Sequence, residues 1–296
     1  MLGIGQILAK GFLSPLHVGS ILRTASFLGI AAVGQTLLIL SGGIDVSVGA
    51  VITAGNVLAC MFINGSNPAT AWAVPAVLLC GAVVGLFNGI LIAYIEIHSL
   101  IMTLITASLV QGLVLIYSKG APKGLSSPIL QVISTSNVFG VPIVVLIWFS
   151  IAVMTIFVLK RTTFGRRIYY IGSNLRAAML NGIRTRLVTT VCYVISGVFA
   201  AMTGVLMAGY TRTAFLGIGT EYTLWTVAAV VVGGTALTGG RGSYLGTFLG
   251  AIVLVVLESI LTILQMPEAG RYVGRGLVIV VMVGAYYLRS PESIEK

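Results

Sequence analysis

Long apolar runs repeat along almost the whole chain, and short polar or turn-rich pieces separate them. An α-helix needs about 20 mostly apolar residues to cross the hydrocarbon core of a bilayer. The pattern therefore predicts an all-α polytopic membrane protein with about 8–10 transmembrane or half-membrane helices. Several runs are near the lower length limit, so some helices are expected to be broken or half-length. The runs lie at about residues 25–41, 46–63, 71–95, 99–117, 141–159, 187–211, 222–238, 244–265 and 273–288.

The composition agrees with this pattern and excludes a soluble protein. Of the 296 residues, 57% are hydrophobic and 8% are charged, whereas a soluble domain carries about 25% charged residues. The hydrophobic surface is therefore expected to face lipid. We expect one transmembrane domain over residues 1–296, because no part of the chain is long and polar enough to form a soluble domain.

The start of the chain departs from the pattern. Only about a dozen residues precede Ser14-Pro15, and Lys10 interrupts them, so a full first span does not fit there. The first span is expected to be truncated or replaced by an interfacial helix. No basic region precedes the short apolar stretch, so a cleavable signal peptide is not predicted.

One polar interruption, residues 160–186, holds seven of the 17 basic residues and no carboxylate. Basic loops between membrane spans tend to remain in the cytoplasm. This segment is therefore predicted to be cytoplasmic, together with the loop 239–243 and the tail from Arg289. Alternation of the spans then places three other loops outside, at 119–140, 212–221 and 266–272. Basic loops also account for the net charge of +10, which therefore does not indicate nucleic-acid binding.

The second half of this basic segment has the signature of a short helix. Ser173 or Asn174 is a natural N-cap, and a helix of about two turns is expected to end near Gly182. Its apolar positions are Ala177, Ala178, Leu180 and Ile183. Two interpretations stay open. The helix lies on anionic lipid headgroups, which basic residues favour, or it docks into a groove of a cytoplasmic partner.

Two glycine-rich motifs interrupt the apolar runs, SGGIDVSVG at 41–49 and GGTALTGGRGS at 233–243. In each motif a Ser/Thr-Gly-Gly triplet, at 41–43 or 238–240, is followed by five residues and another glycine. Transporters are often built from structural repeats with broken helices at matching positions. An internal repeat is therefore one hypothesis for this chain, and chance similarity between glycine-rich segments is the other.

Asp45 follows the first glycine triplet, between two apolar runs. A carboxylate deep in lipid costs about 2.5–3.5 kcal/mol on insertion scales, so it normally faces protein, water or a helix end. Asp45 and Ser47 are predicted to cap the helix that starts near Val46 and to interact with its dipole. The alternative is a direct contact between Asp45 and a polar cargo.

Two segments carry three glycines each at a spacing of four residues, and we call them glycine ladders. This spacing places the glycines on one face of a helix and lets the backbone of a neighbouring helix approach closely, so helix packing accounts for both. They are Gly81-x3-Gly85-x3-Gly89 and Gly242-x3-Gly246-x3-Gly250.

Nucleotide, metal and catalytic motifs are missing from the sequence. A P-loop requires a Gly-Lys pair, which does not occur in the chain. The three cysteines, Cys60, Cys80 and Cys192, lie inside apolar runs without metal-ligand spacing. We therefore predict no catalytic residue, no metal site and no cofactor bound by this chain. If its activity uses ATP, the nucleotide site belongs to another subunit.

Scattered polar residues are the candidates for contact with a neutral, hydroxyl-rich solute. The better candidates are Gln35, Asn56, Asn88 and Glu221. The alternative role for most of them is hydrogen bonding between helices. Few titratable residues lie within the spans, with Glu258 as the main case, which argues against a proton-coupled carrier.

Three segments together resemble the membrane permease subunits of ribose/xylose/arabinose-type ABC importers. They are SGGIDVSVG (41–49), FGRRIYYIGSNLRAAMLNGI (164–183) and VVGGTALTGGRGSYLGTFLGA (231–251). The resemblance implies a multi-pass permease of the bacterial inner membrane that imports a pentose-like sugar by ATP-driven alternating access. It also implies three kinds of partner: an ABC ATPase carrying ATP and Mg, a second permease copy or paralogue, and a periplasmic or lipid-anchored sugar-binding protein.

The resemblance also assigns roles to residues. Coupling to the ATPase would involve Arg166, Arg167, Gly172, Asn174, Ala177, Ala178, Gly182 and Ile183. The pathway and its hinges would involve Gly42, Gly43, Asp45, Ser47, Gly49, Gly239, Gly240 and Arg241. The coupling segment departs from its relatives at Ser173 and Leu175-Arg176, where they more often have Gly and Pro-Glu, and this affects which ATPase fits.

Other functions remain as alternatives. An ion-coupled secondary transporter would take up a small polar solute without ATP. A permease of the same kind would carry a nucleoside, an autoinducer-like molecule or a branched amino acid. A membrane-embedded enzyme or scaffold would move no solute at all.

Overall fold

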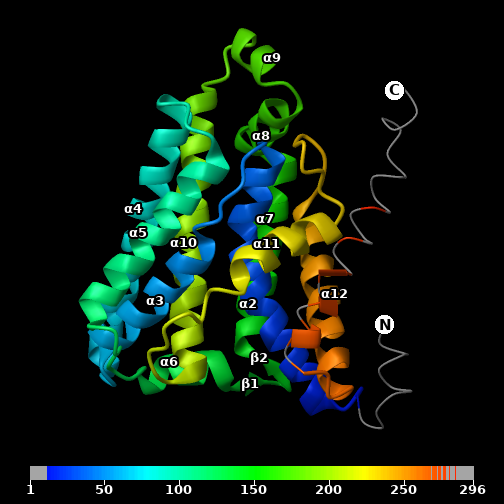
Figure 1. Ribbon diagram of the computed structural model, residues 1–296. Helices are drawn as coiled ribbons and strands as arrows, with labels where there is room; N and C mark the ends of the chain where they lie inside the picture. Colours follow the sequence, from blue (N-terminus) through cyan, green and yellow to red (C-terminus); the bar gives the residue numbers. More distant parts are fainter. Residues whose placement is uncertain are drawn as a thin grey trace.

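The structure, a computed structural model, describes residues 12–267 and, further along the chain, 269–271, 273, 274, 276, 277, 280 and 284. The described part is helical apart from one two-stranded antiparallel hairpin (Figure 1), which confirms the predicted all-α class. The helices are α2 (Pro15–Leu40), α3 (Val48–Ile63), α4 (Asn67–Tyr94), α5 (Ser99–Ser118), α6 (Pro128–Thr135), α7 (Ile143–Arg161), α8 (Thr163–Ser173), α9 (Leu175–Leu180), α10 (Thr185–Thr211), α11 (Tyr222–Val232) and α12 (Tyr244–Ile263). The strands are β1 (Asn137–Val138) and β2 (Val141–Pro142).

Six of the described helices are long and apolar enough to cross a membrane, namely α2, α4, α5, α7, α10 and α12. Two shorter apolar helices, α3 and α11, add half-length elements. The described residues thus contain eight of the expected helices, and the expectation of broken or half-length elements is confirmed.

The first described helix begins earlier than the apolar run at 25–41 predicted. α2 starts at Pro15, where the Ser14 hydroxyl accepts a hydrogen bond from the His17 N–H at 3.4 Å. Proline at the first helical position has its φ already set for a helix. Arg23 lies in the part of α2 that precedes this run, and its guanidinium donates to the Thr135 carbonyl at 2.9 Å.

Three expectations fall outside the described residues. They concern the truncated first span, most of the apolar run 273–288, and the tail from Arg289.

Two helix boundaries in the glycine-rich motifs also differ from the prediction. α11 ends at Val232 instead of continuing to 238, because Gly233 caps it and Gly234 follows with φ +83°. α3 begins at Val48, two residues after the expected start. At the end of α11 the backbone leaves the helix at glycines, which adopt positive φ without steric cost.

The expected outer loop 119–140 contains helix α6 and strand β1, and β2 follows directly after it; the apolar pattern predicted none of these elements. α6 is capped by Ser127, whose hydroxyl accepts from the Leu130 N–H at 3.4 Å. Ser134 then donates to the Leu206 carbonyl of α10 at 2.8 Å. A helix of eight residues held by such tertiary bonds leaves only a weak signal in hydropathy.

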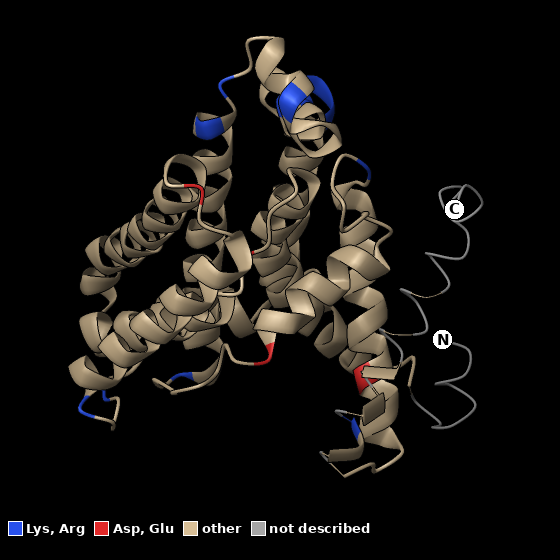
Figure 2. Cartoon of the chain, turned by 45° about the horizontal axis from the view of Figure 1, so that its top comes forward, with Lys and Arg blue, Asp and Glu red and all other residues tan. Residues whose placement is uncertain are grey.

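Loops that were predicted to share a side of the membrane do lie at one end of the molecule. Tyr169 bonds the Gly242 carbonyl at 2.9 Å, which joins the segment 160–186 to the loop 239–243. At the other end, Leu125 pairs with Thr213, so the loops 119–140 and 212–221 meet. Figure 2 shows many of the Lys and Arg residues at the end that carries α8 and α9.

The core is organised around α10, which packs against α2, α3 and α4. The first glycine ladder makes this packing close, as predicted. A Cβ built on Gly85 would lie 2.2 Å from the Tyr193 carbonyl oxygen, and Gly81 and Gly89 face α10 in the same way. In the second ladder Gly246 and Gly250 face α11, whereas Gly242 lies in a loop against Thr235.

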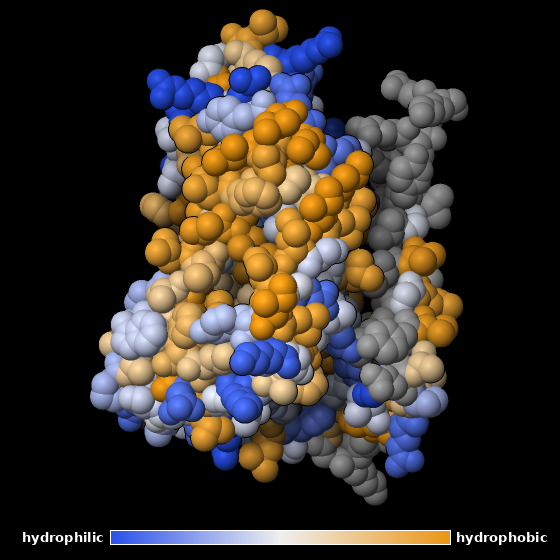
Figure 3. Space-filling model, turned by 60° about the vertical axis from the view of Figure 1, so that its left-hand side comes forward, coloured by the Kyte–Doolittle hydropathy of each residue, from blue (hydrophilic) through white to orange (hydrophobic). Residues whose placement is uncertain are grey.

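The outer surfaces of α4 and α5 carry many exposed large apolar side chains. Figure 3 shows them as an apolar band, with hydrophilic residues above and below it. Such a band is what lipid-facing helices require, because each end then contacts water and headgroups. The chain is a multi-pass membrane protein.

Candidate functional site

The first half of the basic segment forms helix α8. Thr162 caps α8, since its hydroxyl accepts from the Gly165 N–H at 3.2 Å. Ile168 and Ile171 are buried on one face, while Arg166 and Arg167 are exposed on the other. The helix is therefore amphipathic and presents its two arginines away from the protein.

The short helix predicted in the second half is present as α9. Of the two candidate caps, Asn174 is the one used: its side-chain oxygen accepts from the Ala177 N–H at 2.9 Å. Ala178 is buried beneath the helix. α9 stops before Gly182, whose φ of +73° turns the chain toward Ile183 and α10.

The α8–α9 element has a groove and an apolar tip. The groove has a volume of about 530 Å³ and lies between the two helices, with Arg166, Arg167 and Asn174 among its lining residues. At the tip, Leu180 is 89% exposed and Met179 is 49% exposed. Figure 1 shows α9 projecting past the ends of the spanning helices, so these apolar side chains extend away from the lipid-facing band.

Three segments that are far apart in the sequence meet at one point, which we call the glycine junction and define as Gly42, Gly172, Gly239 and Gly240. The Gly240 N–H donates to the Leu40 carbonyl at 2.9 Å. A Cβ on Gly172 would lie 1.9 Å from the Leu40 oxygen and 2.5 Å from the Gly240 nitrogen. A Cβ on Gly239 would lie 3.0 Å from the Gly172 Cα and 3.2 Å from the Gly42 nitrogen.

The glycine junction joins the end of α8 to both helix breaks. Gly42 and Gly239 have φ of +86° and +87°; Gly42 follows the end of α2, and Gly239 lies in the segment between α11 and α12. The equal φ values are a local similarity between the two motifs; the internal repeat as a whole stays a hypothesis. Contact through backbone atoms alone is possible because none of these residues has a side chain.

A second link joins α8 to the loop 239–243. The Tyr169 hydroxyl donates to the Gly242 carbonyl at 2.9 Å, and burial raises the pKa of Tyr169, which keeps the hydroxyl protonated as a donor. The loop is closed by the Ala236 N–H bonding the Arg241 carbonyl at 2.9 Å. The Arg241 side chain itself is exposed at this end.

Asp45 is buried and fully engaged with protein groups. One carboxylate oxygen accepts the Ser47 N–H at 2.8 Å and the Ser47 hydroxyl at 2.5 Å; the other accepts the Ser196 hydroxyl at 2.7 Å. The N-cap position of α3 is Ser47, which makes no side-chain cap bond. The predicted capping is thus displaced: Asp45 holds the N–H of the residue immediately before the helix.

The Asp45 cluster extends to α4 and α5 through Asn88. The Asn88 amide donates to the Ser47 hydroxyl at 3.1 Å and accepts from Thr106 at 2.6 Å. The Val46 N–H is bonded by Thr103 at 3.1 Å. Asn88, a candidate for cargo contact, therefore has both ends of its amide bonded within the bundle.

The two half-length helices start beside each other. A Cβ on Gly49, in the first turn of α3, would lie 2.2 Å from the Thr223 hydroxyl oxygen of α11 and 2.5 Å from the Gly219 carbonyl oxygen. Glu221 is the N-cap residue of α11 and is partly exposed. Half-helices whose N-termini meet inside the membrane are a common way to build a transport site.

The remaining candidates differ in their hydrogen bonding. The Asn56 carbonyl accepts from the Phe215 N–H at 2.8 Å, while its amide nitrogen has no partner within the described part. Gln35 is fully buried, and neither of its amide atoms has a partner among the described residues. Gly43 lies against Tyr193, whose hydroxyl oxygen would be 2.9 Å from a Cβ at that position.

The sequence analysis missed several residues that complete these contacts. Ser196, Tyr169 and Gly219 were not singled out, since each resembles many other serines, tyrosines and glycines of the chain. Only their tertiary partners distinguish them. Within the described residues, no group of three or more His, Cys, Asp and Glu side chains is placed to hold a metal ion.

Comparison with known proteins places the chain among permeases. A sequence model of the family described as "Branched-chain amino acid transport system / permease component" matches residues 18–284. The ribose import permease protein RbsC of Bacillus subtilis is 35% identical over 286 residues, covering 95% of this chain and 87% of the relative. The protein of the same name from Haemophilus influenzae is 32% identical over 287 residues, covering 96% and 88%.

A third relative has another named cargo. The autoinducer 2 import system permease protein LsrC of Escherichia coli is 31% identical over 277 residues, covering 93% of this chain and 80% of the relative. No solved structure is significantly similar to the chain.

Proposed function

The chain belongs to the family of branched-chain amino acid transport system permease components, and from this membership we propose that it is the translocating subunit of an ATP-driven sugar importer. The resemblance to ABC sugar permeases that the sequence motifs indicated is confirmed by the relatives named for ribose import. Two further parts of the proposal are the energy source and the cargo.

The observation that carries the proposal is the glycine junction. The chain has no Gly-Lys pair and hence no P-loop, so we propose that ATP and Mg bind to a separate ABC ATPase. Movement imposed on α8 by that partner acts at Gly172, which touches Leu40 and Gly240. Both helix breaks then move together, and the half-helices that start at Val48 and Tyr222 change their tilt.

The α8–α9 element is proposed as the docking surface for the ATPase. Its groove carries Arg166 and Arg167, and no carboxylate between 160 and 186 neutralises them. An acidic surface on the partner would therefore pair with them. Leu180 favours a protein partner over lipid headgroups, because the tip that carries it projects away from the lipid-facing band and an apolar pocket of a partner would remove this side chain from water.

The basic residues of the α8–α9 element also indicate the orientation of the chain in its membrane. We propose that the chain lies in the bacterial inner membrane with residues 160–186 in the cytoplasm, as the excess of basic residues favours. The C-terminal tail would lie on the same side. A periplasmic or lipid-anchored sugar-binding protein would deliver cargo to the opposite end, where α6 and the β1–β2 hairpin lie, and a second permease copy or paralogue would complete the path.

The proposed cargo is a ribose-like sugar. Two relatives are named for ribose import at 32% and 35% identity. Gln35 and Asn56 retain hydrogen-bonding atoms without partners among the described residues, which suits a solute rich in hydroxyl groups. An autoinducer 2 cargo is the second candidate, because the relative named for it has a comparable 31% identity. Competition for uptake between the two solutes would separate them.

The relatives do not favour an ion-coupled carrier or a membrane enzyme. An ion-coupled carrier would still drive uptake in vesicles without ATP and partner subunits, and its uptake would collapse with the ion gradient. An enzyme or scaffold would move no solute under any condition.

The test is charge reversal in the docking groove. In the variant Arg166→Glu/Arg167→Glu, co-purification of the ATPase and ATP-driven ribose uptake are both expected to be lost. The matched control is Lys160→Glu/Arg161→Glu at the end of α7, which removes the same number of positive charges outside the groove. The control separates loss of docking from a change in membrane orientation.

Retention of ATPase binding and uptake by Arg166→Glu/Arg167→Glu would show that docking occurs elsewhere. Equal loss in both double variants would instead trace the effect to topology. Surface labelling of each variant in intact cells shows whether the segment has kept its side of the membrane.

A further inference from the structure

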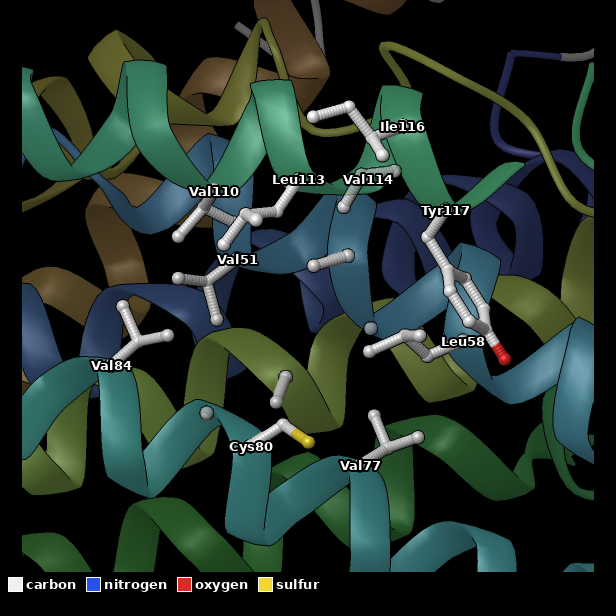
Figure 4. A pocket seen from close by; sticks show the side chains of 14 residues that line it. Val51, Leu58, Val77, Cys80, Val84, Val110, Leu113, Val114, Ile116 and Tyr117 are labelled. Carbon is white, nitrogen blue, oxygen red and sulfur yellow. The ribbon is translucent and has the colours of Figure 1, made fainter. Parts of the chain in front are cut away.

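A large apolar cavity lies between α4 and α5, and its lining includes no residue of the glycine junction or of the Asp45 cluster. Its volume is about 420 Å³, and α3, α4, α5 and α10 contribute its fourteen lining residues. Figure 4 shows the side chains of α4 and α5 approaching it from opposite sides. Among the described residues that line it, the Cys80 thiol and the Tyr117 hydroxyl are the only polar side-chain groups.

The floor of the cavity is buried, whereas its rim is open to the outside. Val51 and Val77 at the floor are 3% and 1% exposed. Leu113 and Ile116 at the rim are 64% and 77% exposed. Figure 3 shows a hollow within the apolar band on this side of the molecule. The opening therefore faces the hydrocarbon region of the bilayer.

The apolar lining excludes a sugar as occupant, since a hydroxyl-rich solute would lose its hydrogen bonds to water without replacement. The cavity is about three times the ~150 Å³ apolar cavity that accepts one benzene molecule, so it has room for roughly one acyl chain. A helix of a second copy would not fit, because a 10 Å length of α-helix occupies roughly 800 Å³.

Positive charge lies at one end of the cavity. Tyr117 lines that end, and Lys119 caps α5 directly after it, with Lys123 in the following loop. Both lysines are exposed, and no carboxylate occurs in the sequence between Glu96 and Glu221. A phosphate on a molecule whose tail fills the cavity would lie near these cations.

We propose that the cavity between α4 and α5 is a lipid-binding site. It holds one acyl chain of a phospholipid whose phosphate is bound by Lys119 and Lys123. Because acyl chains in a bilayer already have apolar neighbours, burial from water does not drive this binding. Two other contributions drive the binding of the acyl chain. The chain fills a void whose lining atoms would otherwise lack contacts, and the headgroup charge is attracted to the lysines. The site is independent of the proposed transport function.

The test uses the full chain in bilayer nanodiscs that contain phosphatidylglycerol with a photoreactive group on one acyl chain. Photolysis followed by peptide mapping identifies the residues that the chain contacts. Cross-links are expected on the segments around Val51, Cys80 and Leu113. Cys80→Phe fills the cavity and is expected to reduce these cross-links about tenfold, whereas Val83→Phe, on the exposed side of α4 outside the cavity, leaves them unchanged.

A second filling variant and a headgroup variant complete the design. Ala54→Phe fills the cavity from α3 and carries the same expectation if Cys80→Phe does not fold. Lys119→Gln/Lys123→Gln is expected to lower the preference for phosphatidylglycerol over phosphatidylcholine by about fivefold per lysine. Lys160→Gln, at the opposite end of the molecule, serves as its control.

Several outcomes would overturn the proposal. One is cross-linking spread evenly over the lipid-facing helices, and another is equal cross-linking in Cys80→Phe and Val83→Phe. Oxidative cross-linking between Cys80 residues of two chains would show that a second copy covers the opening, because the other two cysteines are buried. An unchanged lipid preference in the double lysine variant would remove the headgroup part of the site.

Discussion

Replacing Gly172 by alanine tests whether the glycine junction transmits movement. The perturbation is one methyl group at a point where three backbones meet. It would lie 1.9 Å from the Leu40 carbonyl oxygen, whereas ordinary contacts begin at 3.4 Å. The end of α8 must therefore move away from Leu40 by about 1.5 Å, the difference between these two distances.

The expected change in stability is moderate. Overpacking costs about 1–3 kcal/mol, and loss of the Gly240–Leu40 hydrogen bond costs about 0.5–1.5 kcal/mol. Alanine gains about 1 kcal/mol over glycine within a helix. The net destabilisation is about 0.5–3.5 kcal/mol, and most of this range leaves a folded, inserted protein.

The assay is ATP-driven ribose uptake into proteoliposomes that contain the permease, the ATPase and the binding protein. Gly172→Ala is expected to reduce uptake about tenfold, the factor that 1.4 kcal/mol of strain in the moving state produces. ATPase binding should persist, because Arg166 and Arg167 are unchanged. The control is Gly112→Ala in α5, where nothing lies within 4 Å of an added Cβ, so uptake should be unaffected.

Full uptake by Gly172→Ala would refute the reasoning, since the junction would then tolerate displacement. Failure of the variant to insert would show that the destabilisation is larger than the range given above. Loss of uptake together with loss of ATPase binding would locate the defect in docking and not in transmission.

Two further predictions concern single hydrogen-bonding groups. Asp45→Ala leaves the Ser47 N–H and the Ser196 hydroxyl without their acceptor, which costs about 1–3 kcal/mol per group. It should therefore lower the thermal unfolding temperature in detergent far more than Asp45→Asn, which keeps an acceptor oxygen. Equal effects of the two variants would mean that the charge of Asp45, and not its hydrogen bonds, stabilises the protein. Tyr169→Phe removes the bond to the Gly242 carbonyl, worth about 0.5–1.5 kcal/mol, and should lower ATP-driven uptake severalfold. The control Tyr210→Phe, on a residue of α10 that is 42% exposed and lies outside the docking groove, should not lower uptake; identical uptake in both variants would make the link dispensable.

Much of the fold could be predicted because each spanning helix must be apolar over nearly its whole length. The runs at 71–95, 99–117 and 187–211 correspond closely to α4, α5 and α10. The errors occur where length and hydropathy stop being decisive. α6 is held by tertiary hydrogen bonds, and α11 ends early at Gly233 although the apolar run continues.

In the candidate site, too, local interactions could be predicted from the sequence and long-range ones could not. Asn174 was identifiable as a cap because capping is a local interaction between neighbouring residues. The bonds of Asp45 to Ser196 and of Tyr169 to Gly242 join residues that are distant in the sequence. No local pattern distinguishes such partners, so the sequence supplied one residue of each pair.

By itself, the sequence determined the class of protein, the positions of the spans, the sidedness of the loops relative to one another and the lack of a nucleotide motif. Each of these depends on composition or on short-range order. Only the tertiary structure decided that Gly42, Gly172, Gly239 and Gly240 meet, that Asn88 is bonded within the bundle, and that α4 and α5 leave an apolar cavity between them. The reason is physical: close packing is a property of surfaces brought together from distant segments, and a glycine or a valine does not specify its neighbour until the helices are assembled.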